Sequence, residues 1–163
     1  GGYDMSRDLG VEMFVGFDQF VYGKGEMELA TRTLGLGVRA APFVANLTGS
    51  VSDPERAFRE AEAARKCGFR HGGGLNPAVV EPQNRGFTPP EADINDARWV
   101  LEQYRKLADS SDTWVEINGR IIDRYEAARA QELLEWAALC AEHDRLKAEA
   151  VARTRTAEEA WGR

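Results

Sequence analysis

The sequence has few of the residues and patterns that mark specialised classes of protein. Of its 163 residues only two are cysteines and two are histidines, and neither Cys67 nor Cys140 has the close Cys or His neighbours of a zinc site. We therefore interpret both cysteines as buried, reduced thiols. Basic residues are fewer than acidic ones, 21 against 27, and they form no cluster. This argues against a nucleic-acid partner, because phosphate binding needs Lys and Arg gathered on one face.

Long apolar runs are also missing. No stretch of about 18 apolar residues is present to span a bilayer, and no basic segment followed by an apolar one stands near the start to direct secretion. We expect a cytoplasmic protein with no membrane partner. The chain begins with Gly1 rather than Met, so we expect it to be part of a longer protein. What is present, 43% apolar residues, is enough for the core of about one domain.

The first half of the chain alternates helical and extended patterns. Residues 24–34 have the apolar spacing of a helix, and residues 38–47 have that of a short buried strand. Residues 69–75 are predicted to form a second strand. Asp53 is a favourable N-cap, with Pro54 at the first helical position, for a helix between the two strands. Strand, helix and strand in this order predict a βαβ unit and therefore an α/β fold.

The second half predicts a turn at residues 84–86, followed by a helix, a hairpin and another helix. Residues 88–91 (TPPE) have the spacing of a capping box, and apolar residues then recur every three or four positions. Asn118-Gly119 favours the two-residue turn of a β-hairpin. A long helix is predicted from about residue 125 to about residue 153.

Four segments carry a resemblance to a known family. They are YDMSRDLG at residues 3–10, GFRHGGGLNP at 68–77, NRGFTP at 84–89 and NGRIID at 118–123. In this order and spacing they resemble the motifs of the citrate lyase beta-chain-like family of CoA-ester lyases, within the HpcH/HpaI aldolase superfamily. The resemblance implies an enzyme that cleaves or forms a C–C bond of a 3-hydroxyacyl-CoA of the citryl-, malyl- or citramalyl-CoA type. Its other ligands are then a small keto acid and an acyl-CoA.

The fold of that family is a TIM-type (β/α)₈ barrel followed by a C-terminal extension. The resemblance therefore implies that residues 1–87 are the last βα units of a barrel. Residues 88–163 are then a helix, hairpin and helix extension that caps a neighbouring subunit. A barrel needs eight strands to close, so this chain supplies only part of one. Assemblies of the family imply a homo-oligomer, either a trimer or a hexamer.

Asp4 lies where the family has one of the two carboxylates that hold Mg²⁺, with Mn²⁺ as the other possible ion. Magnesium prefers oxygen ligands and keeps several waters beside one or two carboxylates, so one Asp completed by substrate oxygens is chemically reasonable. The alternative, which the residues alone favour, is that Asp4 caps the N-terminus of a helix.

Asp123 lies where the family has an acid that reaches into the active site of a neighbouring subunit. Cleavage releases an acetyl-CoA enolate that must be protonated, and condensation needs the reverse proton transfer. The resemblance thus implies that Asp123 is the catalytic acid or base. The alternative is that Asp123 is the N-cap of the long helix, and one residue can fill both roles.

The end of the second strand corresponds to part of the family's CoA pocket, formed here by Gly74, Leu75, Asn76 and Pro77. Bare backbone beside a ligand is one reason to use glycine, and a flexible turn is the other. The sequence departs from the family at this point. Asn76 stands where His is usual, and three glycines replace a common Gly-Lys pattern.

Two other functions compete with the lyase. One is a CoA-independent, metal-dependent aldolase of hydroxy-keto acids, which lacks the extension present here in residues 88–149. The other is a non-catalytic fragment or assembly module, because the family's second carboxylate and its substrate-binding Arg are not in this chain. The four tryptophans lie at scattered spacings, and we interpret them as core-packing and subunit-contact residues.

Overall fold

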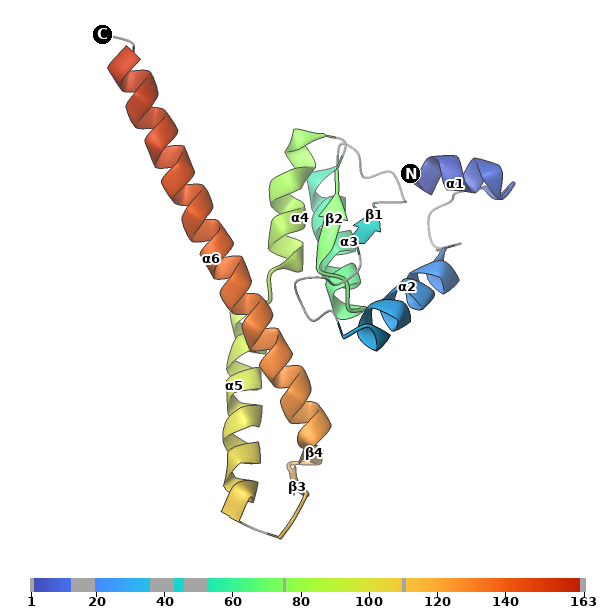
Figure 1. Ribbon diagram of the computed structural model, residues 1–163, viewed down its shortest axis with the longest axis vertical. Helices are drawn as coiled ribbons and strands as arrows, with labels where there is room; N and C mark the ends of the chain where they lie inside the picture. The colour runs from blue at the N-terminus through green and yellow to red at the C-terminus, as the bar shows by residue number, and fades with distance from the viewer. Residues whose placement is uncertain are drawn as a thin grey trace. The chain divides into compact units, whose positions relative to one another are not determined.

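The computed structural model describes residues 2–12, 20–35, 43–45, 53–74, 76–109 and 111–161. The chain divides into two compact units, Gly1–Thr88 and Pro89–Arg163, and each is described by itself (Figure 1). Within the described ranges, no helix has the length and apolar character needed to cross a membrane.

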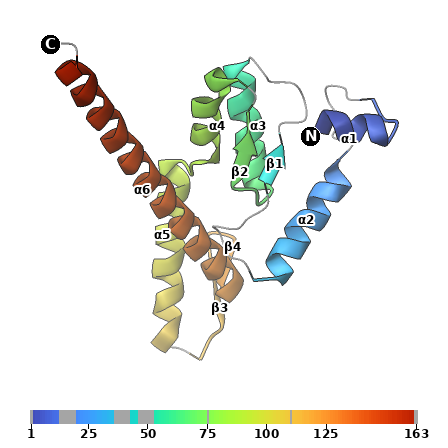
Figure 2. The ribbon, with the colours of Figure 1, turned by 45° about the horizontal axis from the view of Figure 1, so that its top comes forward.

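The first unit contains a small parallel sheet with helices beside it. Its elements are α1 (Gly2–Asp8), α2 (Val21–Thr33), β1 (Phe43–Ala45), α3 (Pro54–Lys66), β2 (His71–Gly73), the 3₁₀ turn η2 (Pro77–Val79) and α4 (Val80–Phe87). Strands β1 and β2 lie side by side and parallel, with Phe43 opposite His71 and Ala45 opposite Gly73 (Figure 2). Parallel strands need a crossover connection, and α3 is that connection. The predicted βαβ unit is confirmed, although most of the range predicted for its first strand lies outside the described residues.

Helix α3 begins as its sequence predicts. The side chain of Asp53 accepts a hydrogen bond from the backbone N–H of Arg56 at 3.1 Å, and Pro54 occupies the first turn. The helix buries Ala57 and Ala61 completely or nearly so. Ala61 packs with Phe69 and Phe87 into the small core of this unit, so α3 joins the strand region to α4.

Helix α4 corrects the predicted turn at residues 84–86. These residues lie inside α4, and Gly86 is buried against α3. A Cβ at Gly86 would lie 2.6 Å from both the Ala61 Cβ and the Phe58 carbonyl oxygen. The glycine is present because the two helices approach closely, and a glycine inside a helix can have such a packing role as well as mark a turn.

The interpretation of the cysteines as buried is also wrong for one of them. Cys67 is exposed, and Cys140 is half-buried. Cys67 is the C-cap residue of α3, a position at the end of a helix where the side chain faces solvent. Cys140 lies on the long helix of the second unit.

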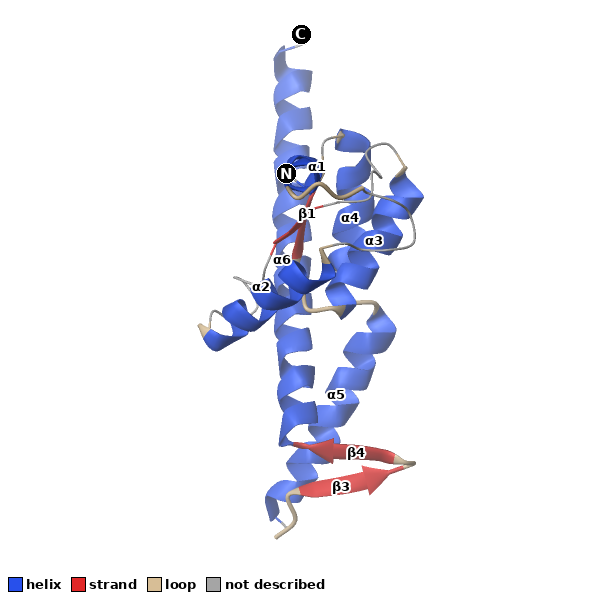
Figure 3. Ribbon diagram, turned by 90° about the vertical axis from the view of Figure 1, so that its right-hand side faces the viewer, coloured by secondary structure: helices blue, strands red, loops and turns tan. Residues whose placement is uncertain are grey.

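The second unit is an antiparallel helix pair with a hairpin at one end (Figure 3). Its elements are α5 (Glu91–Arg105), the 3₁₀ turn η3 (Lys106–Asp109), β3 (Trp114–Ile117), β4 (Arg120–Asp123) and α6 (Arg124–Trp161). Ala97 and Val100 of α5, Ile122 of β4 and Ala130 of α6 form the buried core. The helix predicted after residue 88 is confirmed, but its capping box is not. The N-cap is Pro90, whose side chain has no group that can form a cap bond. The Thr88 hydroxyl donates instead to the Asn84 carbonyl of α4.

The hairpin forms around the Asn-Gly pair as predicted. Asn118 and Gly119 have φ values of 53° and 79°. Two successive residues with positive φ are the requirement of a type I′ turn, whose twist suits antiparallel strands. The turn sets the register in which Trp114 pairs with Asp123 and Ile117 with Arg120.

Helix α6 follows β4 without a loop and has 38 residues, which corresponds to about 57 Å at 1.5 Å per residue. Its first half packs on α5 and the hairpin, whereas every side chain from residue 141 to residue 155 is exposed. The predicted long helix is confirmed and continues to Trp161.

Candidate active site

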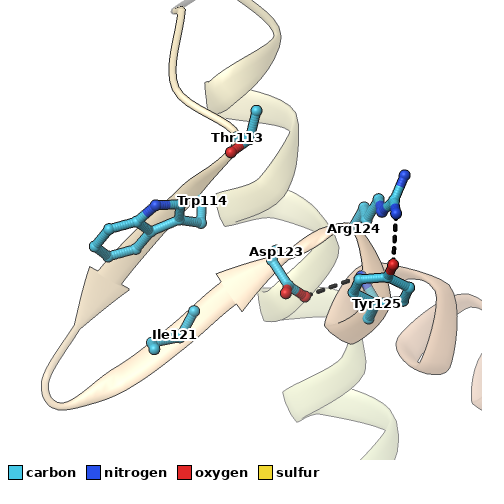
Figure 4. A pocket seen from close by; sticks show the side chains of 6 residues that line it. All are labelled: Thr113, Trp114, Ile121, Asp123, Arg124 and Tyr125. Atoms are coloured by element: carbon cyan, nitrogen blue, oxygen red, sulfur yellow. Dashed lines mark hydrogen bonds between the residues drawn. The ribbon is translucent and has the colours of Figure 1, made fainter.

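Asp123 stands at the junction between the hairpin and the long helix. It is the last residue of β4, and its Oδ1 accepts a hydrogen bond of 2.9 Å from the backbone N–H of Tyr125 (Figure 4). The backbone N–H of Glu126 donates to the same oxygen, also at 2.9 Å. The predicted N-cap role of Asp123 is therefore confirmed, because these are two of the N–H groups that a helix leaves unpaired at its start. The backbone of α6 fixes the orientation of the carboxylate.

Strand alternation puts Asp123 on the exposed face of the hairpin. Ile122 points the other way and is fully buried between the helices. Successive side chains of a strand face opposite sides, so Ile121 shares the face of Asp123, as does its cross-strand partner Trp114. The hairpin thus has a face anchored in the core and a second face that presents a carboxylate.

An open recess of about 510 Å³ surrounds Asp123. Its lining residues are Thr113, Trp114, Ile121, Asp123, Arg124 and Tyr125. The three large apolar side chains are more than half exposed, with values of 53% for Trp114, 56% for Ile121 and 66% for Tyr125. The Arg124 guanidinium lies 4.5 Å from the centre of the Tyr125 ring and donates to its hydroxyl. The recess therefore combines apolar surface with one carboxylate, of Asp123, and one guanidinium group, of Arg124.

An ion-pair cluster lies beside Asp123, formed by Asp96, Arg120, Glu126 and Arg129. Hydrogen bonds from Arg129 lower the pKa of Glu126 to about 2, with Arg120 acting in the same direction, although burial opposes the change. Hydrogen bonds to Asp96 and Glu126 raise the pKa of Arg120 above its usual value. Arg120, Glu126 and Arg129 are therefore charged at neutral pH.

Asp4 is the third residue of α1, and its side chain is exposed. It is not an N-cap, because α1 begins before it, and this corrects the alternative interpretation of Asp4. A carboxylate in the first turn of a helix interacts favourably with the helix dipole. In the ranges that the structure describes, no group of three or more His, Cys, Asp or Glu side chains is arranged to hold a metal ion. The metal role of Asp4 stays a prediction.

The residues predicted to bind CoA have local structural roles wherever they are described. Asn76 Oδ1 accepts a hydrogen bond from the Ala78 N–H at 3.0 Å and caps η2, in which Pro77 takes the first position. A Cβ at Gly74 would lie 2.7 Å from Val79 Cγ2. Leu75 lies outside the described residues. These contacts explain the turn after β2, and the CoA role of the segment stays a prediction.

Three functional candidates escaped the sequence analysis. Trp114 meets Asp123 because of the hairpin register, and Ile121 shares the face of Asp123 because side chains alternate along β4. Arg120 meets Asp96 across 24 residues of sequence. A signal for the first two was present. Once an Asn-Gly turn is assumed, counting back along both strands places Trp114 opposite Asp123.

No family model matches the chain. Two relatives are similar in sequence over 134 residues, or 82% of this chain. The citrate lyase subunit beta of Leuconostoc mesenteroides subsp. cremoris is 23% identical, and the match covers 43% of that protein. A citrate lyase subunit beta-like protein of Deinococcus radiodurans is 29% identical, with 45% covered. The chain therefore spans less than half the length of these relatives.

A solved structure is similar in fold. It is the protein CitE from Mycobacterium tuberculosis, in complex with magnesium, acetoacetate and coenzyme A. The TM-score is 0.68 at 19% identity, and the likeness covers 85% of this chain and 50% of that one. This likeness concerns the fold and agrees with a partial α/β architecture.

Proposed function

We propose that the chain is a member of the citrate lyase beta-like family and that the protein to which it belongs is a CoA-ester lyase. The reaction is cleavage or formation of a C–C bond in a 3-hydroxyacyl-CoA, with a keto acid and an acyl-CoA as the other reactants. The single observation that carries the proposal from this chain's own geometry is the capped Asp123 carboxylate within an exposed apolar recess. The names of the relatives and the ligands of the fold neighbour support the class of reaction.

Asp123 is the catalytic acid or base in this proposal. The enolate of an acyl-CoA takes up a proton at carbon after cleavage and gives one up before condensation, and a positioned carboxyl group can exchange that proton. Within the described part of the chain, both hydrogen bonds to Asp123 use Oδ1, so Oδ2 is the atom for proton transfer. The two N–H donors fix the direction in which Oδ2 points.

The apolar residues around Asp123 support a site that closes against another surface. Trp114, Ile121 and Tyr125 expose more than half of their side chains. Large apolar side chains gathered on one face are typical of interaction sites. We infer a homo-oligomer, a trimer or a hexamer, in which the hairpin covers the active site of a neighbouring subunit and brings Asp123 to it.

Asp4 fits the proposed metal by donor type. Its exposed carboxylate is the hard oxygen ligand that Mg²⁺ or Mn²⁺ takes, and substrate oxygens and ligands from the rest of the protein would complete the shell. A bound divalent ion supplies charge stabilisation for the keto-acid oxygens. The proposed place for part of the CoA is formed by Gly74, Leu75, Asn76 and Pro77, of which Gly74 is exposed. The α/β unit before residue 88 is proposed to be the end of a TIM-type barrel.

The test is an acyl-CoA cleavage assay on the complete protein, with malyl-CoA and citramalyl-CoA, with and without Mg²⁺. The decisive variant is Asp123→Asn, because Asn caps a helix about as well as Asp but has no titratable carboxyl group. We expect kcat to fall by about 10²- to 10⁴-fold, the usual contribution of a general acid or base. The midpoint of unfolding should stay within experimental error of the wild type.

Asp144→Asn is the matched control, since Asp144 is an exposed carboxylate on the same helix, far from the recess. It should leave kcat unchanged. Asp4→Asn should raise the Mg²⁺ concentration needed for half-maximal activity, because it removes a proposed metal ligand. Full turnover by Asp123→Asn would refute its catalytic role. A folded, complete protein without any cleavage activity would favour the CoA-independent aldolase or the non-catalytic module.

A further inference from the structure

The Arg120 guanidinium connects three elements of the second unit. Its Nη1 and Nη2 donate to the two carboxylate oxygens of Asp96 on α5, at 2.6 and 3.0 Å. Nη2 also donates to Glu126 Oε1 in the first turn of α6, at 2.5 Å. A paired contact of this kind uses the planar fork of Arg, which fixes the angle as well as the distance. One side chain of β4 therefore holds the hairpin to both helices.

Further contacts keep the guanidinium in place. It lies over the Trp99 ring of α5, 5.7 Å from the ring centre, a favourable arrangement for a cation and an aromatic face. Glu126 is held in turn by Arg129, one turn along α6, with distances of 2.9 and 3.1 Å. The side chains of Arg120 and Glu126 are 33% and 23% exposed, which makes them less accessible than the surface ion pairs farther along α6.

Glu126 links this cluster to Asp123 directly. Its carboxylate accepts from Arg120, and its own backbone N–H donates to Asp123 Oδ1. Arg120 and Asp123 are also the first and last residues of β4, on opposite faces of the strand. The strand and the first turn of α6 thus form a closed ring of contacts from Arg120 through Glu126 to Asp123 and back along β4.

We propose that Arg120 is a positioning residue for Asp123, acting through its joint grip on Asp96 and Glu126. Arg120 touches no reactant in this proposal. It holds the end of β4 at the start of α6, so that Asp123 Oδ2 keeps the direction needed for proton transfer. The inference rests on the proposed role of Asp123. It adds that full activity also requires an Arg at residue 120.

The first readout is kinetic and uses the complete protein. A misplaced catalytic group lowers kcat, and displacement by about 1 Å can cost about 100-fold. We expect Arg120→Ala to lower kcat by about 10- to 100-fold with KM nearly unchanged, and Asp96→Asn to have a smaller effect in the same direction. Arg120→Lys should recover only part of kcat, because an ammonium group keeps the charge but lacks the fork. Guanidinium ions added at low millimolar concentration should partly restore Arg120→Ala.

Arg145→Ala is the matched control. Arg145 also bridges two carboxylates, Glu142 and Glu149, but it does so on the exposed part of α6. Removing it should leave both kcat and KM as in the wild type. An equal loss of kcat in Arg145→Ala and Arg120→Ala would overturn the proposal, because the effect would then follow from any lost ion pair on α6.

The second readout does not depend on catalysis. Hydrogen exchange at the amides of Tyr125 and Glu126 reports the two bonds that hold Asp123. We expect about tenfold faster exchange at these amides in Arg120→Ala and in Asp96→Asn, and no change in Arg145→Ala. This result would support the positioning role even if the complete protein proved not to be a lyase. Unchanged exchange together with unchanged kcat in folded Asp96→Asn and Arg120→Lys would overturn it.

Discussion

Gly86 offers a sharp test of the packing between α3 and α4. In most helices a change from glycine to alanine stabilises by about 1 kcal/mol, because alanine is the better helix former. Here the new Cβ would lie 2.6 Å from the Ala61 Cβ, 2.6 Å from the Phe58 carbonyl oxygen and 3.0 Å from the Glu62 nitrogen. No rotation of a flexible side chain relieves these contacts, since two of the three atoms are backbone. Overpacking of this kind costs about 1–3 kcal/mol, so we expect Gly86→Ala to destabilise by up to about 2 kcal/mol after the helix gain is subtracted.

The assay is thermal and urea unfolding followed by circular dichroism, with Gly25→Ala as the control. Gly25 lies inside α2, and a Cβ there meets nothing within 4 Å, so the same substitution should stabilise α2 by up to about 1 kcal/mol. Gly86→Ala should lower the midpoint of a unit of this size by up to roughly 15 °C, whereas Gly25→Ala should not lower it. If Gly86→Ala stabilises the chain as Gly25→Ala does, the close approach of α3 and α4 is wrong.

Three other outcomes test the remaining structure. Ile122→Ala should destabilise the second unit by about 2–5 kcal/mol in urea unfolding, because its side chain is fully buried, whereas Ile121→Ala should stay within about 0.5 kcal/mol. Asp53→Ala should cost about 1 kcal/mol through the lost cap of α3, and Asp53→Asn should cost nearly nothing. Because the pKa of Glu126 is lowered from its ordinary value of 4.5, the ionised side chain stabilises the folded state above about pH 4.5, and this contribution should disappear as the pH falls towards about 2. The full pKa change corresponds to a free energy of about 3 kcal/mol, and solvent screening reduces this contribution to about 1–2 kcal/mol. Glu126→Gln should remove it from the pH dependence of unfolding.

Contradicting results are easy to recognise for these three. Equal effects of the substitutions at Ile121 and Ile122 would mean that the hairpin is packed the other way round. A costly Asp53→Asn would mean that the charge of Asp53, rather than its cap bond, stabilises α3. A Glu126→Gln variant that loses stability between pH 5 and pH 2 as steeply as the wild type would place the acid sensitivity elsewhere.

Local signals in the sequence predicted the elements whose structure is itself decided locally. Asp53-Pro54 predicted the start of α3, and Asn118-Gly119 predicted the type I′ turn, because a cap and a tight turn depend on a few adjacent residues. The strand, helix and strand order was also sufficient to predict the parallel pair of β1 and β2. The cap and the turn each depend on about four neighbouring residues, and the parallel pairing depends on the order of the elements.

The errors arose where a distant contact determines the role of a residue. Gly86 has the local character of a turn residue, but its function is to let α3 approach α4. Thr88 has the spacing of a capping residue, but its hydroxyl is already bonded to the Asn84 carbonyl. Arg120 had no recognisable signal, because its partner Asp96 is on another helix. Burial and ion pairing depend on the assembled fold, which neighbouring residues do not encode.

The candidate site was predicted unevenly for the same reason. Asp123 followed from its motif and from its place before a helix, and the structure gives it the cap that this place requires. The exposed partner Trp114 was identified only from the hairpin register, and Ile121 only from the alternation of side chains along β4. For Asp4, the sequence provides a carboxylate and the structure shows that it is exposed in the first turn of α1. For Asn76, the structure shows the bond that caps η2. The metal role of Asp4 and the CoA role of residues 74–77 stay predictions.

The direct continuity of β4 and α6 has a mechanical consequence. The last strand residue is Asp123 and the first helical residue is Arg124, so no flexible loop absorbs movement between the carboxylate and the helix axis. Residue 145 lies about 33 Å along that axis, at 1.5 Å per residue. A tilt of about 2° at the start of the helix would displace that residue by about 1 Å. A spectroscopic label on the exposed part of α6 would therefore amplify small reorientations of the carboxylate and make them measurable from outside the recess.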